Sequence, residues 1–227
     1  MTIDALNLQF LRDLKNNNNR EWFAENKLNY EKHQAKLVSF AEKMMDCLSE
    51  HDKIEYKSGK KSVIRVYRDI RFSKDKSPYK TYSGMGFRRS SQLLRGGYYL
   101  HIEPGNSFVG GGFWEPNKED LLKIRKGIEF DEGEFRKIIT SEEFVSVFGK
   151  LKGNQLKTCP KGFSKDSSAI DLLRYKQYLL TKEFSDDEVL LDTFFDEADK
   201  VFKAMRPFLD FMSYILTTDE NGVPLFE

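Results

Sequence analysis

Basic side chains recur at short intervals along residues 65–80, between aromatic and β-branched residues. The side chains assigned to a candidate ligand site here are Arg65, Arg68, Asp69, Arg71, Lys74, Lys76, Tyr79 and Lys80. Guanidinium groups grip phosphate or carboxylate at two points, and lysines among small hydroxyl residues can surround an anion. Residues 57–95 carry twelve Lys and Arg against two acids, a net charge of +10 in a chain whose total is +1. Because clustered charge focuses an electrostatic field, this asymmetry predicts a surface for phosphate, carboxylate or nucleic acid.

Arg68 has two interpretations. Alternation along a strand at 63–72 would place it among apolar side chains, where an unpaired charge costs several kcal/mol. An internal ion pair, for example with an acid of the C-terminal helix, would then be required. The opposite strand face carries Arg65 and Arg71 and is the better candidate for ligand contact. Asp69 stands between two arginines, which should lower its pKa and make it a clamp for a guanidinium group rather than a base.

The turn at 73–80 is also open to two interpretations, a loop that surrounds an anion or a solvated hairpin tip. It contains no Gly-x-x-x-x-Gly-Lys pattern and is therefore not a nucleotide P-loop. Interleaved Tyr67, Phe72 and Tyr79 resemble the stacking residues of single-strand binders. The composition argues against a dedicated nucleic-acid protein, because the pI is near 7.7 and residues 183–227 hold twelve acids against three bases.

Candidate groups outside the basic segment are fewer. The glycines at 110–112 precede a predicted helix N-terminus, where backbone amides favour an anion, and Arg125 in that helix could supplement them. Glycine in a strand more often marks a bulge or close backbone packing, which is the alternative for this run. Arg174 could join the basic segment or form a salt bridge. On a strand at 97–103, His101 and Glu103 share a face and could transfer protons, although a single histidine in a sheet is more often simply packed.

The periodicity predicts an α+β fold, an antiparallel meander of about four to six strands packed by N-terminal and C-terminal helices in a single domain. The helical N-terminal part covers about 4–50, the sheet about 62–114 and the helical C-terminal part about 117–218. Expected strands are 63–72, 79–88, 97–103 and 107–114. Expected helices are 6–14, 19–48, 117–128, 131–139, 142–148 and 186–216, with Pro207 as a kink or break in the last.

Composition places the chain among ordinary globular proteins, with 39% hydrophobic and 14% aromatic residues for a core. No apolar run reaches membrane-spanning length, so we expect a soluble cytoplasmic protein without membrane contact. Cys47 and Cys159 stand alone, which predicts reduced thiols and no metal site. The sequence names no cofactor and leaves the oligomeric state open.

Several segments together resemble the bacterial and fungal domain-of-unknown-function family 2461. The resemblance rests on segments spread over nearly the whole chain, namely 10–14, 18–27, 67–80, 111–116, 124–125 and 170–176. It implies a single α+β domain and no activity. It also marks the central basic motif as the set of positions to test, although such a motif can serve the fold as well as a site.

Three hypotheses follow. In the first, the basic segment binds a small phosphate-bearing or carboxylate-bearing molecule, as a binding protein or an enzyme. In the second, it binds nucleic acid, which requires an affinity that falls steeply with salt. In the third, it is an internal scaffold paired with the acidic C-terminal helices, and the protein works through another surface.

Overall fold

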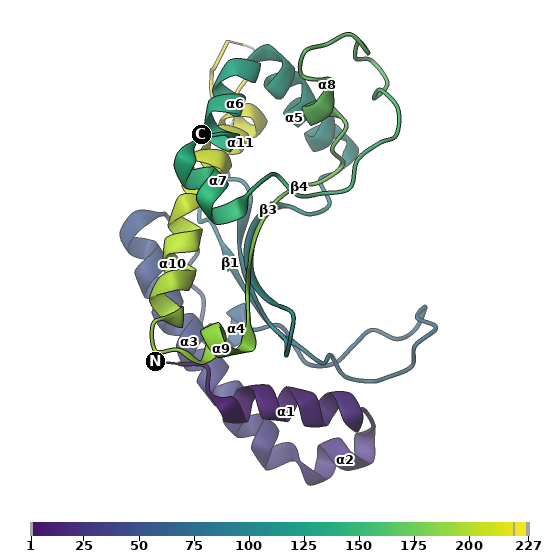
Figure 1. The fold of residues 1–227 in the computed structure, drawn as a ribbon, viewed down its shortest axis with the longest axis vertical. Helices are drawn as coiled ribbons and strands as arrows, with labels where there is room; N and C mark the ends of the chain where they lie inside the picture. Colours follow the sequence, from purple (N-terminus) through teal and green to yellow (C-terminus); the bar gives the residue numbers. More distant parts are fainter. Residues whose placement is uncertain (1, 220, 226–227) are drawn as a thin grey trace. The chain divides into compact units, whose positions relative to one another are not determined.

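A computed structural model describes residues 2–219 and 221–225 of the chain. It has the predicted α+β fold, with a four-stranded sheet in the order β1-β2-β3-β4 (Figure 1). The chain divides into two compact units. Unit 1 comprises Met1–Phe87, Tyr99–Val109 and Glu183–Lys200, and unit 2 comprises Arg88–Tyr98, Gly110–Lys182 and Val201–Glu227. Each strand of the sheet contributes residues to both units.

Three strands form the predicted meander: β1 (Ser83–Arg88), β2 (Gly97–Ile102) and β3 (Ser107–Phe113). The fourth, β4 (Tyr178–Phe184), lies far along the chain and was not predicted. The prediction of a strand at 63–72 was wrong. That segment makes only isolated bridges, Val63 with Met85 and Tyr67 with Tyr79, because it turns back on itself instead of pairing along its length.

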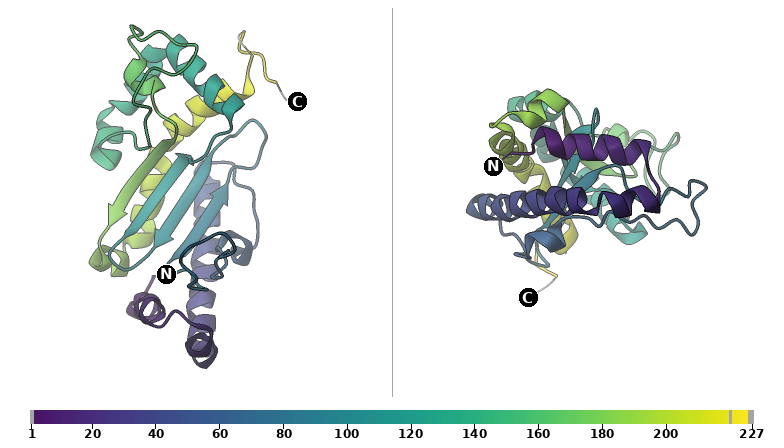
Figure 2. Two further views of the ribbon diagram at one scale, coloured as in Figure 1. Left: turned by 90° about the vertical axis from the view of Figure 1, so that its right-hand side faces the viewer. Right: turned by 90° about the horizontal axis from the view of Figure 1, so that it is seen from below.

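In unit 1, α1 (Ala5–Asn16) begins at a capping box in which the Asp4 carboxylate accepts from the Asn7 amide. The single helix expected at 19–48 is instead two, α2 (Arg20–Glu25) and α3 (Lys27–His51). Asn26 separates them, and its side chain donates back to the Trp22 carbonyl. Figure 2 shows α1 beside α3. The remaining short helices of unit 1 are α4 (Gly59–Ser62) and α9 (Asp186–Leu190).

A buried polar chain joins these elements within unit 1. The Asn7 amide nitrogen lies 2.8 Å from His33 Nδ1, and His33 Nε2 lies 2.8 Å from Ser83 Oγ. Because the Asn7 amide donates to Nδ1, the imidazole is held neutral, with its proton on Nε2. Burial lowers the pKa of His33 to about 4.

We expect this histidine to make stability depend on pH. Its folded pKa of about 4 lies below the ordinary value of 6.5, so its contribution is present above pH 6.5 and is lost as pH falls towards 4. The loss amounts to about 3 kcal/mol of unfolding free energy at most. Urea unfolding at pH 7.5 and 4.5 measures it. The difference between the two pH values should shrink in His33→Gln, and an equal difference in both proteins would contradict the assignment.

Unit 2 has the helices expected at 117–128, 131–139 and 142–148, a short helix at 170–173 that was not predicted, and a helix from the element expected at 186–216. They are α5 (Lys118–Phe130), α6 (Glu132–Ile139), α7 (Glu142–Phe148), α8 (Ile170–Leu173) and α11 (Arg206–Thr217). Asn117 caps α5, since its side chain accepts from the Asp120 amide at 2.8 Å. The element expected at 186–216 is divided into α9, α10 (Phe194–Ala204) and α11. Pro207 lies in the first turn of α11, where its missing N–H is tolerated.

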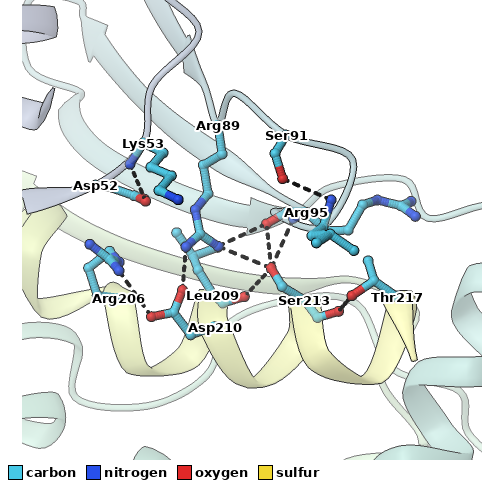
Figure 3. A network of polar contacts seen from close by, with 11 residues as sticks. Asp52, Lys53, Arg89, Ser91, Arg95, Arg206, Leu209, Asp210, Ser213 and Thr217 are labelled. Carbon is cyan, nitrogen blue, oxygen red and sulfur yellow. Dashed lines mark hydrogen bonds and ion pairs between the residues drawn. The ribbon is translucent and has the colours of Figure 1, made fainter. Parts of the chain in front are cut away.

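Arg89 forms the centre of a polar network in unit 2 (Figure 3). Its side chain has no exposed area, and it pairs with Asp210 of α11. It also donates to Ser213 Oγ at 3.0 Å and to the Arg95 carbonyl at 3.4 Å. Ser213 Oγ accepts from the Arg95 amide at 2.9 Å, so the loop before β2 is tied to α11 through one hydroxyl. No helix among the described residues is long and apolar enough to cross a membrane.

Candidate functional site

The basic segment forms an arm, which we define as residues 65–80 and call the basic arm. It lies in unit 1 between α4 and β1 and is drawn in Figure 1 as an extended loop. The Arg68 amide donates to the Pro78 carbonyl at 2.9 Å, and the Lys80 amide donates to the Val66 carbonyl at 2.7 Å. These bonds and the bridge between Tyr67 and Tyr79 fold the two halves of the arm together.

Arg68 is not buried among apolar residues. Its guanidinium pairs with Asp75 and donates to the Ser77 carbonyl at 3.0 Å, so both partners belong to the arm itself. An ion pair with the C-terminal helix is therefore the wrong interpretation of this arginine. The pKa of Asp75 is lowered to about 2, chiefly by the hydrogen bond from Ser77 and further by Arg68. The carboxylate thus stays ionised and fixes the guanidinium within the arm.

Asp69 clamps Arg71, as the sequence suggested. The guanidinium donates Nε to one carboxylate oxygen at 3.0 Å and Nη2 to the other at 2.7 Å. Those hydrogen bonds are the main reason that the pKa of Asp69 lies below its ordinary value. The guanidinium carbon of Arg71 also lies 5.9 Å from the centre of the Phe72 ring. Both acids of the arm are therefore engaged by its own arginines.

The lysines of the arm differ in their surroundings. Lys80 Nζ donates to the Arg65 carbonyl at 2.7 Å and to the Tyr67 carbonyl at 2.8 Å, and Lys76 Nζ donates to the Ile70 carbonyl at 3.0 Å. Burial lowers the pKa of Lys80, and the nearby charges of Arg65 and Arg68 lower it further. Within residues 2–219 and 221–225, Arg65, Lys74, Lys76 and Lys80 form no ion pair. The arm holds six cations and two acids, so its net charge is +4.

Aromatic residues form the base of the arm. Tyr79 stacks on Phe23 of α2 with ring centres 4.0 Å apart, and Tyr67 lies 5.5 Å from Tyr79. Asn18 holds the Tyr79 backbone at both ends, donating to its carbonyl at 3.0 Å and accepting from its amide at 3.1 Å. Among the described residues nothing hydrogen-bonds the hydroxyls of Tyr30, Tyr67 or Tyr79. These phenols are polar groups available to a ligand.

Sequence reasoning missed part of this base. Asn18 and Phe23 were not among the candidate site residues predicted from the sequence. Both contact the arm through pairings more than 50 residues apart in the chain. No periodic signal marks such a pairing. The one available signal was that Asn18 and Phe23 fall in the segments that carry the family resemblance.

A second polar chain lies on β2. The Tyr99 hydroxyl lies 3.1 Å from His101 Nδ1, and His101 Nε2 lies 3.2 Å from the Glu103 carboxylate. Burial lowers the pKa of His101, with Glu103 opposing the shift, and burial raises the pKa of Tyr99 far above its usual range. A Cβ on Gly84 would lie 2.5 Å from the Tyr99 hydroxyl, so this chain needs glycine on β1. The arrangement can hold a proton, but His101 also packs between Phe108 and Tyr82 as an ordinary sheet histidine does.

The two remaining predicted residues, Arg125 and Arg174, lie in unit 2. Arg125 donates to the Tyr175 carbonyl at 2.9 Å, and the Nε atoms of both arginines are buried without a hydrogen-bond partner. Neither arginine forms an ion pair with any described residue, so that part of the structure shows no salt bridge for Arg174. No group of three or more possible metal ligands occurs within residues 2–219 and 221–225.

Comparison with known proteins adds one match. Residues 7–211 match the family described as conserved hypothetical protein (DUF2461), which covers most of the 227 residues and includes the whole basic arm. No curated protein and no solved structure matches the sequence.

Proposed function

We infer that the basic arm of this chain, which belongs to the conserved hypothetical protein family DUF2461, binds a small phosphate-bearing or carboxylate-bearing ligand. One observation carries the proposal. Burial lowers the pKa of the Lys80 ammonium, the nearby charges of Arg65 and Arg68 lower it further, and no carboxylate among the described residues pairs with it. Three cations gathered in this way repel one another, and a bound anion would relieve the repulsion.

The arm's own acids relieve that repulsion only in part, because Asp75 pairs with Arg68 while Arg65 and Lys80 form no ion pair with any described residue. Asp69 is occupied by Arg71 and Asp75 by Arg68, and these pairs hold the side chains in fixed geometry. Fixed donors favour ligand binding because less side-chain freedom is lost when the ligand arrives. Tyr67, which is 55% exposed, adds a neutral phenol to the same arm. This combination suits an anion with several oxygen acceptors.

The scaffold hypothesis receives less support. Arg68 and Arg71 find their carboxylates within the arm, and Lys76 and Lys80 bind backbone carbonyls of the arm. Those contacts explain how the arm keeps its shape. They leave the exposed Arg65 and Lys74 without a structural task.

We expect Arg65→Gln to weaken binding of pyrophosphate about tenfold, because one charge-assisted contact is lost at a partly solvated site. Isothermal titration calorimetry with pyrophosphate, inorganic phosphate and malonate measures this. Lys32→Gln is the matched control, since Lys32 is an exposed cation of α3 in the same unit, and its affinity should equal that of the unaltered protein. Absence of binding to all three anions, or equal weakening in both variants, would overturn the proposal.

A further inference from the structure

The tip of the basic arm exposes a phenylalanine. Phe72 is 96% exposed, although the turn that carries it is ordered by hydrogen bonds. The Ile70 carbonyl accepts from the Ser73 amide at 3.3 Å and from Lys76 Nζ at 3.0 Å. The hydrogen-bonded turn therefore holds the Phe72 side chain in solvent, with the Arg71 guanidinium beside its ring.

A second aromatic face is exposed nearer the base. Tyr67 is 55% exposed, and its ring is supported on the inner side by Phe23 and Tyr79 at centroid distances of 6.3 and 5.5 Å. Tyr67 and Phe72 are five residues apart on the same half of the arm. Cations lie along the arm between and beyond them, from Arg65 to Lys80.

Exposure alone does not distinguish Phe72. Phe130 at the end of α5 is 91% exposed as well, but its chain neighbours are Glu129 and Asp131. A single exposed apolar residue is ordinary on protein surfaces. The basic arm differs because two exposed rings belong to one short segment with a net charge of +4.

We propose that the phosphates recognised by the arm belong to a single-stranded nucleic acid, whose bases stack on Phe72 and Tyr67. This proposal rests on the anion binding inferred above and names its ligand class. Proteins that bind single strands combine a cationic track for the backbone with aromatic platforms for the bases. A duplex keeps its bases stacked on each other and cannot use these platforms.

A membrane surface fits the arm less well. The tip offers one apolar side chain, whereas interfacial binding draws on a broad apolar face. Asp69 and Asp75 flank that tip, but each is paired with an arginine, so these acids do not distinguish a lipid surface from a nucleic-acid strand. A single nucleic-acid strand needs only one ring for each base.

The test is fluorescence anisotropy with a labelled mixed-sequence 12-nucleotide strand, as DNA and as RNA, and with the matching duplex. We expect Phe72→Ala to weaken single-strand binding roughly 5-fold to 100-fold, the range of one lost base stack. Phe130→Ala is the matched control and should change nothing. With about four phosphates neutralised, the affinity should fall ~50-fold between 50 and 200 mM salt.

Each outcome either supports or contradicts the nucleic-acid proposal. If pyrophosphate binds as before and Phe72→Ala affects only the strand, the nucleic-acid proposal holds. If pyrophosphate binds but the strand binds no more tightly than a mononucleotide, or if Phe72→Ala and Phe130→Ala behave alike, this proposal fails and the small-ligand function remains. Binding to phosphatidylserine vesicles in place of the strand would also overturn it. Loss of all anion binding would remove the proposed function together with this inference.

Discussion

Gly112→Ala is expected to lower the unfolding free energy by about 3–5 kcal/mol. Gly112 in β3 has a φ of +114°, which side-chain-bearing residues rarely adopt. A Cβ there would also lie 2.2 Å from the Tyr178 carbonyl oxygen, a backbone atom that cannot rotate away. Backbone strain and overpacking each cost roughly 1–3 kcal/mol, and both act at this position. Thermal unfolding should show a midpoint about 10 °C lower.

Gly133→Ala is the matched control. Gly133 lies in α6, where an added Cβ meets no atom within 4 Å. Alanine is the better helix former, so the same substitution should raise stability by about 0.5–1 kcal/mol here. A Gly112→Ala protein as stable as the unaltered chain would show that the close approach of β3 and Tyr178 is not required.

Gly112 also shows what the sequence could and could not predict. The glycine run at 110–112 was assigned to ligand contact or to close backbone packing, and the structure favours the second, since Gly112 lies against β4. β4 itself was missed. Its alternation of Tyr178, Leu180 and Phe184 is visible in the chain, but its pairing with β3 joins segments more than 60 residues apart. Local patterns predict such an element only when the partner strand is already known.

The local elements were better predicted. A cap such as Asn117 is a short-range signal, and the meander from β1 to β3 connects neighbouring segments. For the basic arm, the sequence predicted some features correctly and others wrongly. Its residues were identified from charge spacing, and Asp69 was correctly expected to clamp a guanidinium. The assumption of a continuous strand placed Phe72 and Arg68 on a buried face, whereas the chain turns and leaves Phe72 in water.

Arg89 gives the second large effect. It lies one residue from the exposed Arg88, and sequence reasoning counted both as part of the same basic segment. In the structure the Arg89 side chain is fully buried and holds Asp210, Ser213 and the Arg95 carbonyl together (Figure 3). Part of the basic charge is therefore structural, and the scaffold hypothesis describes Arg89 better than it describes the arm.

Arg89→Ala is expected to lower the unfolding free energy by about 2–4 kcal/mol, because it removes a fully buried side chain together with its hydrogen bonds and leaves a cavity. In Arg89→Ala the Ser213 hydroxyl would still bond to the Arg95 backbone. Ser213→Ala alone removes one hydroxyl and should cost only about 1 kcal/mol. Arg88→Ala is the control and should stay within 0.5 kcal/mol of the unaltered protein. Urea unfolding of the three variants measures these differences. Equal stability of Arg89→Ala and Arg88→Ala would show that Arg89 stabilises the fold no more than the exposed Arg88 does.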